Sequence, residues 1–236
     1  VTEPEGAERL FRYAQLMVAT CFETARLGTV GASHKHYLAW KDPYPFTAAQ
    51  VGEELGIEHP SQQQTLVAGA LRPAHLLDIV RHFTLFMESS GRVIKIVCRY
   101  QQFRAVQAAT TRLLTGKTRA QDGEVDRRGG IIWHTQGSGK SLTMVFLVRK
   151  LRTDPNLRRF KVVVVTDRKD LQDQLSGTAS LTGETVEVAK NTHKLKTLVK
   201  RPGPGLVFAT IQKYREPEAK KKKQAYAKKT ESLKWN

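Results

Sequence analysis

Cysteine is scarce in this sequence, which contains only Cys21 and Cys98 among its 236 residues. Two isolated cysteines make neither a disulfide framework nor a zinc site, so we expect two free thiols in a reducing cytoplasm. No pair of the seven histidines has the spacing and the partners of metal ligands. These absences exclude the small proteins that disulfides or zinc ions stabilise.

Long apolar runs are also missing. No segment approaches the roughly 18–20 consecutive apolar residues that a membrane-spanning helix needs, and residues 1–5 are too polar to open a signal peptide. We therefore expect a cytoplasmic protein with no membrane partner. The hydrophobic content of 40% is ordinary for a globular protein, and a chain of this length can bury a sizeable core.

Acidic residues are the scarcer charge, because 22 Asp and Glu stand against 39 Lys and Arg, which gives 39 − 22 = +17. The first 100 residues carry 10 of each sign, so residues 101–236 hold 29 − 12 = +17. Residues 213–236 contribute 9 − 3 = +6 of this excess, and the other +11 lies in residues 101–212. The asymmetry indicates an anionic partner, most often nucleic acid. The alternative is a solubilising surface with a lysine-rich tail.

Hydrophobic periodicity divides the first half of the chain into helices and a strand. Thr47 is a candidate N-cap, because its hydroxyl can accept a hydrogen bond from the first turn of a helix. Residues 91–98 are rich in β-branched side chains and predict a strand. Helices are predicted over residues 8–27, 47–56, 74–87 and 100–114, with inward residues Leu76, Leu77, Val80, Phe83 and Phe86 on the third and Phe103, Val106, Leu113 and Leu114 on the fourth.

The second half of the chain alternates strands with helices. Residues 162–165 are four consecutive valines, which is typical of a strand buried on both faces of a parallel sheet. Residues 131–133 and 206–209 are further strand candidates, and helices are predicted over residues 141–152 and from 170–175. This order predicts an α/β fold, in which a parallel sheet has flanking helices.

The sharpest motif is GSGKS at residues 137–141, which lies between a predicted strand and a predicted helix. Its two glycines let the backbone turn tightly, so that several amides and a helix N-terminus can point at one phosphate. In such a loop Lys140 reaches the β and γ phosphates, and Ser141 offers a hydroxyl to Mg²⁺. His134 stands where the common motif begins with glycine, so a chance glycine turn is the alternative.

Residues 131–144 (IIWHTQGSGKSLTM) resemble the nucleotide-binding motif of the restriction (R) subunits of type I restriction-modification enzymes, in which His134 is expected. Those subunits are superfamily-two DNA translocases fused to a nuclease domain. The resemblance implies ATP and Mg²⁺ as cofactors, with Lys140 as the catalytic cation and Ser141 as a magnesium ligand. It implies that ATP is held by Thr135, Gln136, Gly137, Ser138, Gly139, Lys140, Ser141 and Leu142.

Three more segments, residues 99–106, 162–175 and 209–213, resemble the same family. The first resembles the segment with an adenine-contacting glutamine, which by position is Gln102. From the residues alone, Gln102 is a polar side chain on a helix and more often solvated. Asp167 is a weaker candidate for a substitute acid. The resemblance implies DNA contacts at Arg168, Lys169, Thr210 and Gln212, and a solvated loop is the alternative for Arg168 and Lys169.

Segments between residues 10 and 41 resemble the region that follows the nuclease active site in these subunits. The predicted fold class is therefore α/β, with a partial RecA-like P-loop domain preceded by a mixed α/β remnant of a restriction-nuclease-like domain. We predict the C-terminal part of the nuclease-like domain and connecting helices at residues 1–95. The first part of the RecA-like domain follows at residues 96–214, and a lysine-rich tail at residues 215–236.

Two signatures of that family are missing from the sequence. No Glu-x-Lys pair lies on an apolar strand, as a nuclease site requires, and no Asp-Glu box follows Lys213. We therefore expect this chain by itself to bind ATP but hydrolyse it very slowly. The resemblance implies double-stranded DNA as the substrate, and methyltransferase and specificity subunits as partners. The alternatives are a non-catalytic nucleic-acid-binding remnant and an unrelated P-loop NTPase or kinase.

Overall fold

The computed structural model describes residues 11, 13–89, 91–167 and 176–214. The chain divides after Leu157 into two compact units, each with its own sheets and helices. Within the described ranges, no helix is both long enough and apolar enough to cross a bilayer.

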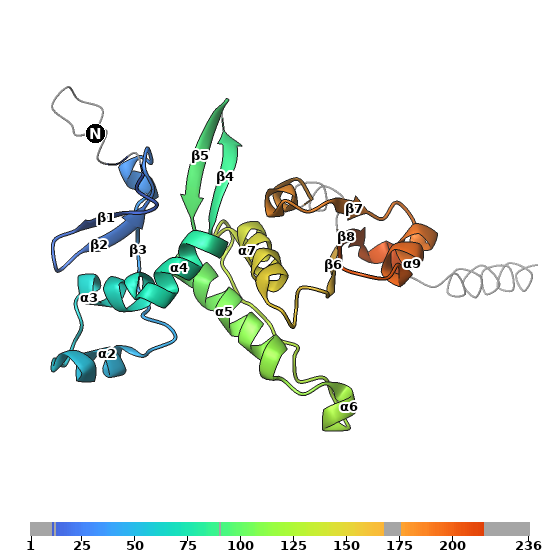
Figure 1. Ribbon diagram of the computed structural model, residues 1–236, viewed down its shortest axis with the longest axis horizontal. Coiled ribbons are helices and arrows are strands. Elements are labelled where there is room, and N and C mark those ends of the chain that lie inside the picture. Colours follow the sequence, from blue (N-terminus) through green and yellow to red (C-terminus); the bar gives the residue numbers. More distant parts are fainter. Residues whose placement is uncertain (1–10, 12, 90, 168–175, 215–236) are drawn as a thin grey trace, which may run out of the picture. The chain divides into compact units, whose positions relative to one another are not determined.

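The first unit opens with a three-stranded antiparallel sheet of β1 (Met17–Thr20), β2 (Ala25–Gly28) and β3 (Leu38–Ala39) (Figure 1). The helix predicted over residues 8–27 is therefore wrong across this hairpin. Phe22, in the turn, has a φ of 61°, a left-handed conformation that cannot continue a right-handed helix. The chain reverses there, and β1 pairs with β2.

Short helices follow the sheet: α2 (Ala48–Leu55), α3 (Gln62–Leu66), a π-helical turn (Val67–Leu71) and α4 (Pro73–His82). The predicted cap of the first of these is confirmed. The Thr47 hydroxyl accepts a hydrogen bond from the third residue of α2, whose side chain in turn accepts from the Thr47 backbone. This reciprocal pair satisfies two amides that a helix leaves without partners.

The helix predicted over residues 74–87 is wrong beyond the end of α4. There the chain becomes extended, and β4 (Thr84–Ser89) pairs antiparallel with β5 (Arg92–Val97), so ladder hydrogen bonds replace helical ones. The strand predicted over residues 91–98 is confirmed. Of the predicted inward stripe, Phe83 is fully buried, whereas Leu77 and Phe86 are 69% and 62% exposed.

Two long helices, α5 (Tyr100–Thr115) and α7 (Lys140–Thr153), pack against each other and confirm two predicted helices. Phe103 of α5 is buried in their core, with its ring centre 5.0 Å from that of Phe83. Leu114, predicted to face inward, is 42% exposed, because the buried residues of α5 end four residues earlier. The core of the first unit therefore lies along the first turns of α5.

Residues 131–133 form no strand, contrary to the prediction. Their backbone has no regular structure, and Ile131 and Trp133 are 95% and 87% exposed. A strand requires a neighbour to satisfy its backbone groups, and the sheets of the described residues include no ladder to this run. The glycine-rich loop therefore follows an exposed apolar segment rather than a buried strand.

The second unit contains a parallel sheet in the order β6 (Lys161–Thr166), β8 (Gly205–Thr210) and β7 (Val186–Val188). The sequence predicts buried strands at residues 162–165 and 206–209. This is right for β8, the middle strand, which is buried from its second residue onward. It is wrong for β6, an edge strand of the described sheet in which Val165 is 45% exposed. The helix predicted from 170–175 lies outside the described residues.

The remaining short elements of the described residues are α6 (Arg119–Asp122) and 3₁₀ turns at His34–His36, Ser180–Thr182 and Ile211–Tyr214.

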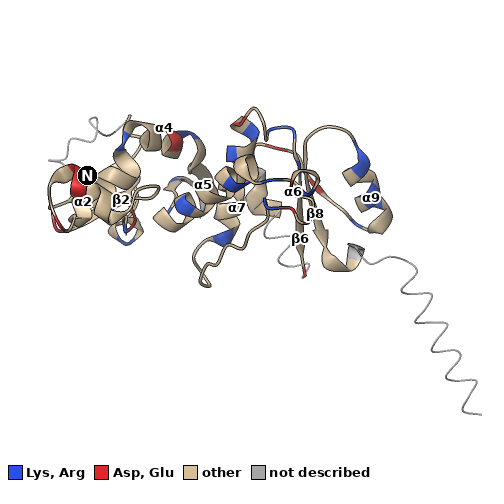
Figure 2. Cartoon of the chain, turned by 90° about the horizontal axis from the view of Figure 1, so that it is seen from below, with Lys and Arg blue, Asp and Glu red and all other residues tan. Residues whose placement is uncertain are grey.

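Helix α9 (Thr192–Lys200) is amphipathic, and its Leu195 and Leu198 are buried in a cluster with Val207 of β8. The exposed positions of the helix carry several lysines, and Figure 2 marks basic positions on its ribbon in blue. Part of the positive excess of residues 101–212 therefore lies on a solvent-facing helix surface.

Candidate nucleotide-binding site

Two glycines shape the loop that leads into α7. Gly137 has a φ of 73° and Gly139 a φ of 82°, in the left-handed region that other residues enter only with strain. The two positions differ in their surroundings. A Cβ on Gly137 would meet nothing within 4 Å, whereas a Cβ on Gly139 would lie 2.6 Å from the side-chain nitrogen of Gln102. A side chain at Gly139 would therefore be strained in conformation and would also have to displace the amide of Gln102.

The N-terminus of α7 offers unsatisfied amides. Gly139 is the N-cap, no side chain caps the helix, and its first turn contains no acidic residue. The first helical backbone bond in this turn runs from the Thr143 amide to the Gly139 carbonyl at 3.1 Å, so the helix geometry leaves the amides before Thr143 without intrahelical acceptors. Such a helix end favours an anion through its amides and its dipole.

In this conformation the loop is closed on the carbonyl of Thr135. Lys140 Nζ donates to that oxygen at 2.8 Å, and Ser138 Oγ donates to it at 2.7 Å. A phosphate bound at the loop offers Lys140 a charged acceptor in place of a neutral carbonyl, and charge-assisted hydrogen bonds are the stronger ones. The loop therefore holds a cation and a hydroxyl donor next to an uncapped helix N-terminus. Thr135, Gln136 and Lys140 are exposed, and Ser141 and Leu142 are half-buried.

Gln102 is 2% exposed, so the interpretation of this residue as a solvated side chain is wrong. Its Nε2 donates to the Gly139 carbonyl at 3.0 Å, and its Oε1 accepts from the Arg99 amide at 2.8 Å. The side chain therefore links the start of α5 to the loop. The role of Gln102 as an adenine contact stays a prediction.

The predicted DNA-contacting residues belong to the second unit. Gln212 is exposed, and its Nε2 donates to the Asp167 carbonyl at 3.0 Å, which joins the segments that follow β8 and β6. Thr210 is only 2% exposed, so its side chain packs at the end of β8 and does not support a direct DNA contact. Arg168 and Lys169 lie outside the described residues.

One polar cluster near α7 was not predicted. Asp78 of α4 accepts a hydrogen bond from Lys150, near the end of α7. Only the Asp78 and His82 pair, four residues apart on one helix face, could have been found from the sequence. Among the described residues, no group of three or more His, Cys, Asp or Glu side chains could hold a metal ion. The Ser141 hydroxyl therefore stays the predicted magnesium ligand.

Comparison with known proteins adds independent findings. A protein-family model described as SWI2/SNF2 ATPase matches residues 101–233. The type I restriction enzyme HindI endonuclease subunit of Haemophilus influenzae is 33% identical over 219 residues, which are 90% of this chain and 20% of that protein. The type I restriction enzyme SsaAORF53P endonuclease subunit of Staphylococcus saprophyticus is 27% identical over 210 residues, 86% of this chain and 20% of that protein. The chain spans about a fifth of the length of these relatives.

Proposed function

The chain belongs to the SWI2/SNF2 ATPase family, and from this premise we propose that it is the ATP-binding part of a type I restriction endonuclease subunit. In the proposed enzyme, ATP turnover drives translocation of duplex DNA, and cleavage of both strands follows. The single observation that carries the proposal is the loop before α7, where two left-handed glycines and Lys140 surround an uncapped helix N-terminus.

Each loop residue has a role in this proposal. The amides at residues 137–142 hold the phosphates, and Lys140 leaves the Thr135 carbonyl to bind the β and γ phosphates. The Ser141 hydroxyl holds Mg²⁺, which when bound neutralises phosphate charge. Lys140 is the catalytic cation, because it stabilises the negative charge that develops on the transferred phosphoryl group. Thr135 and Gln136 shape the entry to the loop. Gln102 is assigned the adenine contact, for which its buried amide would have to leave the Gly139 carbonyl or the Arg99 amide.

The DNA contacts are assigned to the second unit. In the proposal Arg168, Lys169 and Gln212 lie against the phosphate backbone, which positions a translocase without reading its sequence. Residues 158–212 carry 10 Lys and Arg against 5 Asp and Glu, so this part of the second unit has the positive charge that the assignment needs. The proposal keeps the predicted domains at residues 1–95, 96–214 and 215–236, with a nuclease-like remnant first. Methyltransferase and specificity subunits would complete the assembly.

The test is ATP hydrolysis by the protein that carries this chain, with and without duplex DNA. The native protein should show turnover that DNA stimulates, and Lys140→Ala should abolish it while DNA binding persists, because the lysine contacts only nucleotide. The Lys35→Ala variant is the control, since Lys35 is an exposed residue far from the loop in sequence. A protein that binds DNA but no nucleotide would instead be the non-catalytic remnant, and the proposal would fail.

A further inference from the structure

We propose that Asp78 is a positioning residue for the phosphate loop, acting on Lys140 and Ser141 through Lys150 and helix α7. The inference rests on the proposed ATP-binding function and assigns a role to a residue that lies 62 positions before Lys140 in the sequence. Asp78 does not contact the loop. Its effect is to fix where the helix that follows the loop lies.

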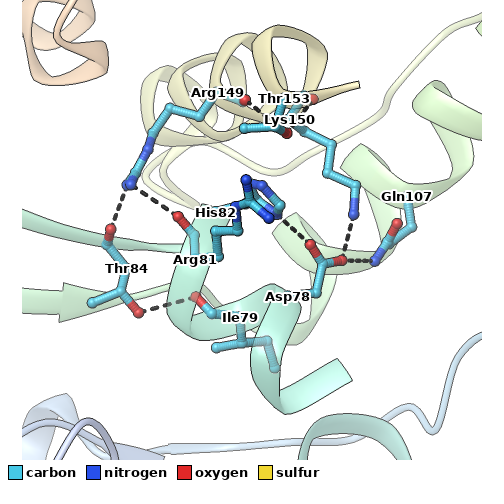
Figure 3. Close-up of polar contacts among 9 residues, drawn as sticks. All are labelled: Asp78, Ile79, Arg81, His82, Thr84, Gln107, Arg149, Lys150 and Thr153. Carbon is cyan, nitrogen blue, oxygen red and sulfur yellow. Dashed lines mark hydrogen bonds and ion pairs between the residues drawn. The ribbon is translucent and has the colours of Figure 1, made fainter. Parts of the chain in front are cut away.

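The carboxylate of Asp78 joins three helices (Figure 3). Its Oδ1 accepts from His82 Nδ1, one turn further along α4, at 2.5 Å. Its Oδ2 accepts from Gln107 Nε2 of α5 and from Lys150 Nζ of α7, each at 2.5 Å. One side chain of α4 therefore holds both of the helices that form the site.

The cluster lies in the interior of the first unit. The side chains of Asp78, His82 and Lys150 are 12%, 10% and 19% exposed. Burial raises the pKa of Asp78, but the hydrogen bonds from His82 and Lys150 outweigh it and leave the pKa below its usual value. The carboxylate is therefore charged at neutral pH. Removing it would leave Lys150 as a largely buried charge without its partner, which is destabilising and favours a shift of the side chain and of the helix that carries it.

The helices transmit this constraint to the loop. Lys150 follows Lys140 by ten residues of one continuous helix, which is about 15 Å along its axis. On α5, Gln107 contacts Asp78, and five residues earlier Gln102 contacts Gly139. Helices α5 and α7 are thus held together at two places along their length, once at the loop and once at Asp78. If the helices shift at Asp78, the geometry of the loop changes with them.

A second set of contacts joins α7 to the end of α4. The guanidinium of Arg149 donates to the Arg81 carbonyl at 3.0 Å and to the Thr84 carbonyl, so it bridges the junction of α4 and β4 (Figure 3). The rings of Phe83, which follows α4, and Phe146 of α7 also pack together, with centres 5.6 Å apart. The backbone carbonyls at the end of α4 and the packed phenylalanine rings therefore hold α7 at this place. In the inference, Asp78 sets how α7 is rotated about its axis and how far it is shifted along it.

If Asp78 had a purely structural role, its replacement would only lower the stability of the fold. A positioning role predicts in addition that the folded variant binds and transfers the γ phosphate less well. Lys140 is proposed to reach the β and γ phosphates, and ADP lacks the latter. A displaced α7 should therefore weaken the binding of an ATP analogue more than that of ADP. It should also lower kcat more than it raises KM, because the lost contact acts on the reacting phosphoryl group.

The experiment uses the protein that carries this chain, and compares Asp78→Asn, Lys150→Met and the double variant. The measurements are kcat, KM and the dissociation constants of ADP and a non-hydrolysable ATP analogue. The control is Asp42→Asn, because Asp42 also pairs with a side chain of α5, Arg104, and its other oxygen accepts from the Tyr44 amide rather than from α7. Circular dichroism and a urea titration confirm the folded fraction of each variant.

We expect Asp78→Asn to lower kcat by about tenfold or more, since a displacement of about 1 Å at a positioned group can cost 10²-fold. The preference for the ATP analogue over ADP should fall with it. The double variant should be no worse than Asp78→Asn, because both changes break one interaction. The Asp42→Asn control should stay within about twofold of the native kcat, as a partly exposed pair contributes little.

Native-like kcat and nucleotide preference in folded Asp78→Asn would overturn the inference. If Asp78→Asn does not fold, Lys150→Met and Gln107→Leu decide, because both keep the carboxylate and each removes one donor. A lowered nucleotide preference in these variants supports the inference, and a native preference in both overturns it. Lys140→Ala separates the two proposals: unchanged ATP binding in this variant would overturn the proposed function itself, and the inference with it.

Discussion

The side-chain amide of Gln102 donates to the carbonyl of Gly139 at 3.0 Å, so α5 holds the N-cap residue of α7. The contact is possible because Gly139 has no side chain: a Cβ there would lie 2.6 Å from Gln102 Nε2. The glycine thus has two functions, a left-handed turn and close packing of a neighbouring helix.

Replacement of Gly139 by alanine should damage the loop more than replacement of Gly137. Both positions have positive φ, and an alanine in that region costs about 1–2 kcal/mol. Only Gly139→Ala adds a clash with Gln102. We expect a larger loss of ATP affinity and of unfolding free energy for Gly139→Ala, measured by calorimetry and urea titration. Equal effects of the two alanines would show that the contact with Gln102 does not matter.

Gln102→Leu should remove the link between α5 and the loop without adding bulk. The Gly139 carbonyl would keep the Thr143 amide as a donor, whereas the Arg99 amide would lose its acceptor, so we expect a loss of about 1 kcal/mol. If Gln102 also contacts the adenine, the preference for ATP over GTP should fall. The measurement is the ratio of the two dissociation constants. Gln121→Leu is the matched control, since Gln121 makes the same capping contact at α6.

Local signals in the sequence were enough for parts of this fold. Thr47 caps α2 through bonds that span three residues. Apolar spacing predicts α5, the glycine-rich turn precedes the predicted α7, and a continuous apolar run predicts β8. The loop was found because its glycines and Lys140 are contiguous. In each case the interactions that decide the structure lie within one element or one turn.

The sequence was not sufficient to predict structure that depends on contacts between segments far apart in the chain. Residues 131–133 look like a strand but have no ladder among the described sheets, and residues 8–27 have helical spacing but contain a turn at Phe22. The burial of Gln102 and the Asp78 cluster depend on helices far apart in the sequence. Spacing within a segment carries no information about which other segment will cover it.

The salt dependence of DNA binding should identify the proposed backbone contacts. Each phosphate that a cation neutralises contributes about −0.9 to the slope of log K against log salt concentration. Arg168→Ala and Lys169→Ala should each make that slope shallower by about this amount and weaken binding equally for unrelated duplexes. Lys35→Ala should leave the slope unchanged. An unaltered slope in the first two variants would place the DNA elsewhere.

The interaction between Asp78 and Lys150 should depend on pH in a defined direction. The pKa of Asp78 is lowered in the folded protein, so its charged form stabilises the fold above the unfolded value of about 3.9. This contribution is lost as the pH falls through the lower, folded pKa. A double-mutant cycle with Asp78→Asn and Lys150→Met therefore yields a coupling energy that is present at neutral pH and vanishes in acid.

The exposed pair of Asp126 and Arg128 is the natural comparison for that cycle. Hydrogen bonds from Arg128 lower the pKa of Asp126 to about 2, yet solvent and salt screen the pair. We expect its coupling to be small and to disappear in high salt, whereas the coupling of Asp78 with Lys150 should survive salt because both side chains are largely buried. Urea titrations at low and high salt measure both. If salt abolished the Asp78 coupling as well, the carboxylate would behave as a surface charge and could not hold α7 in place.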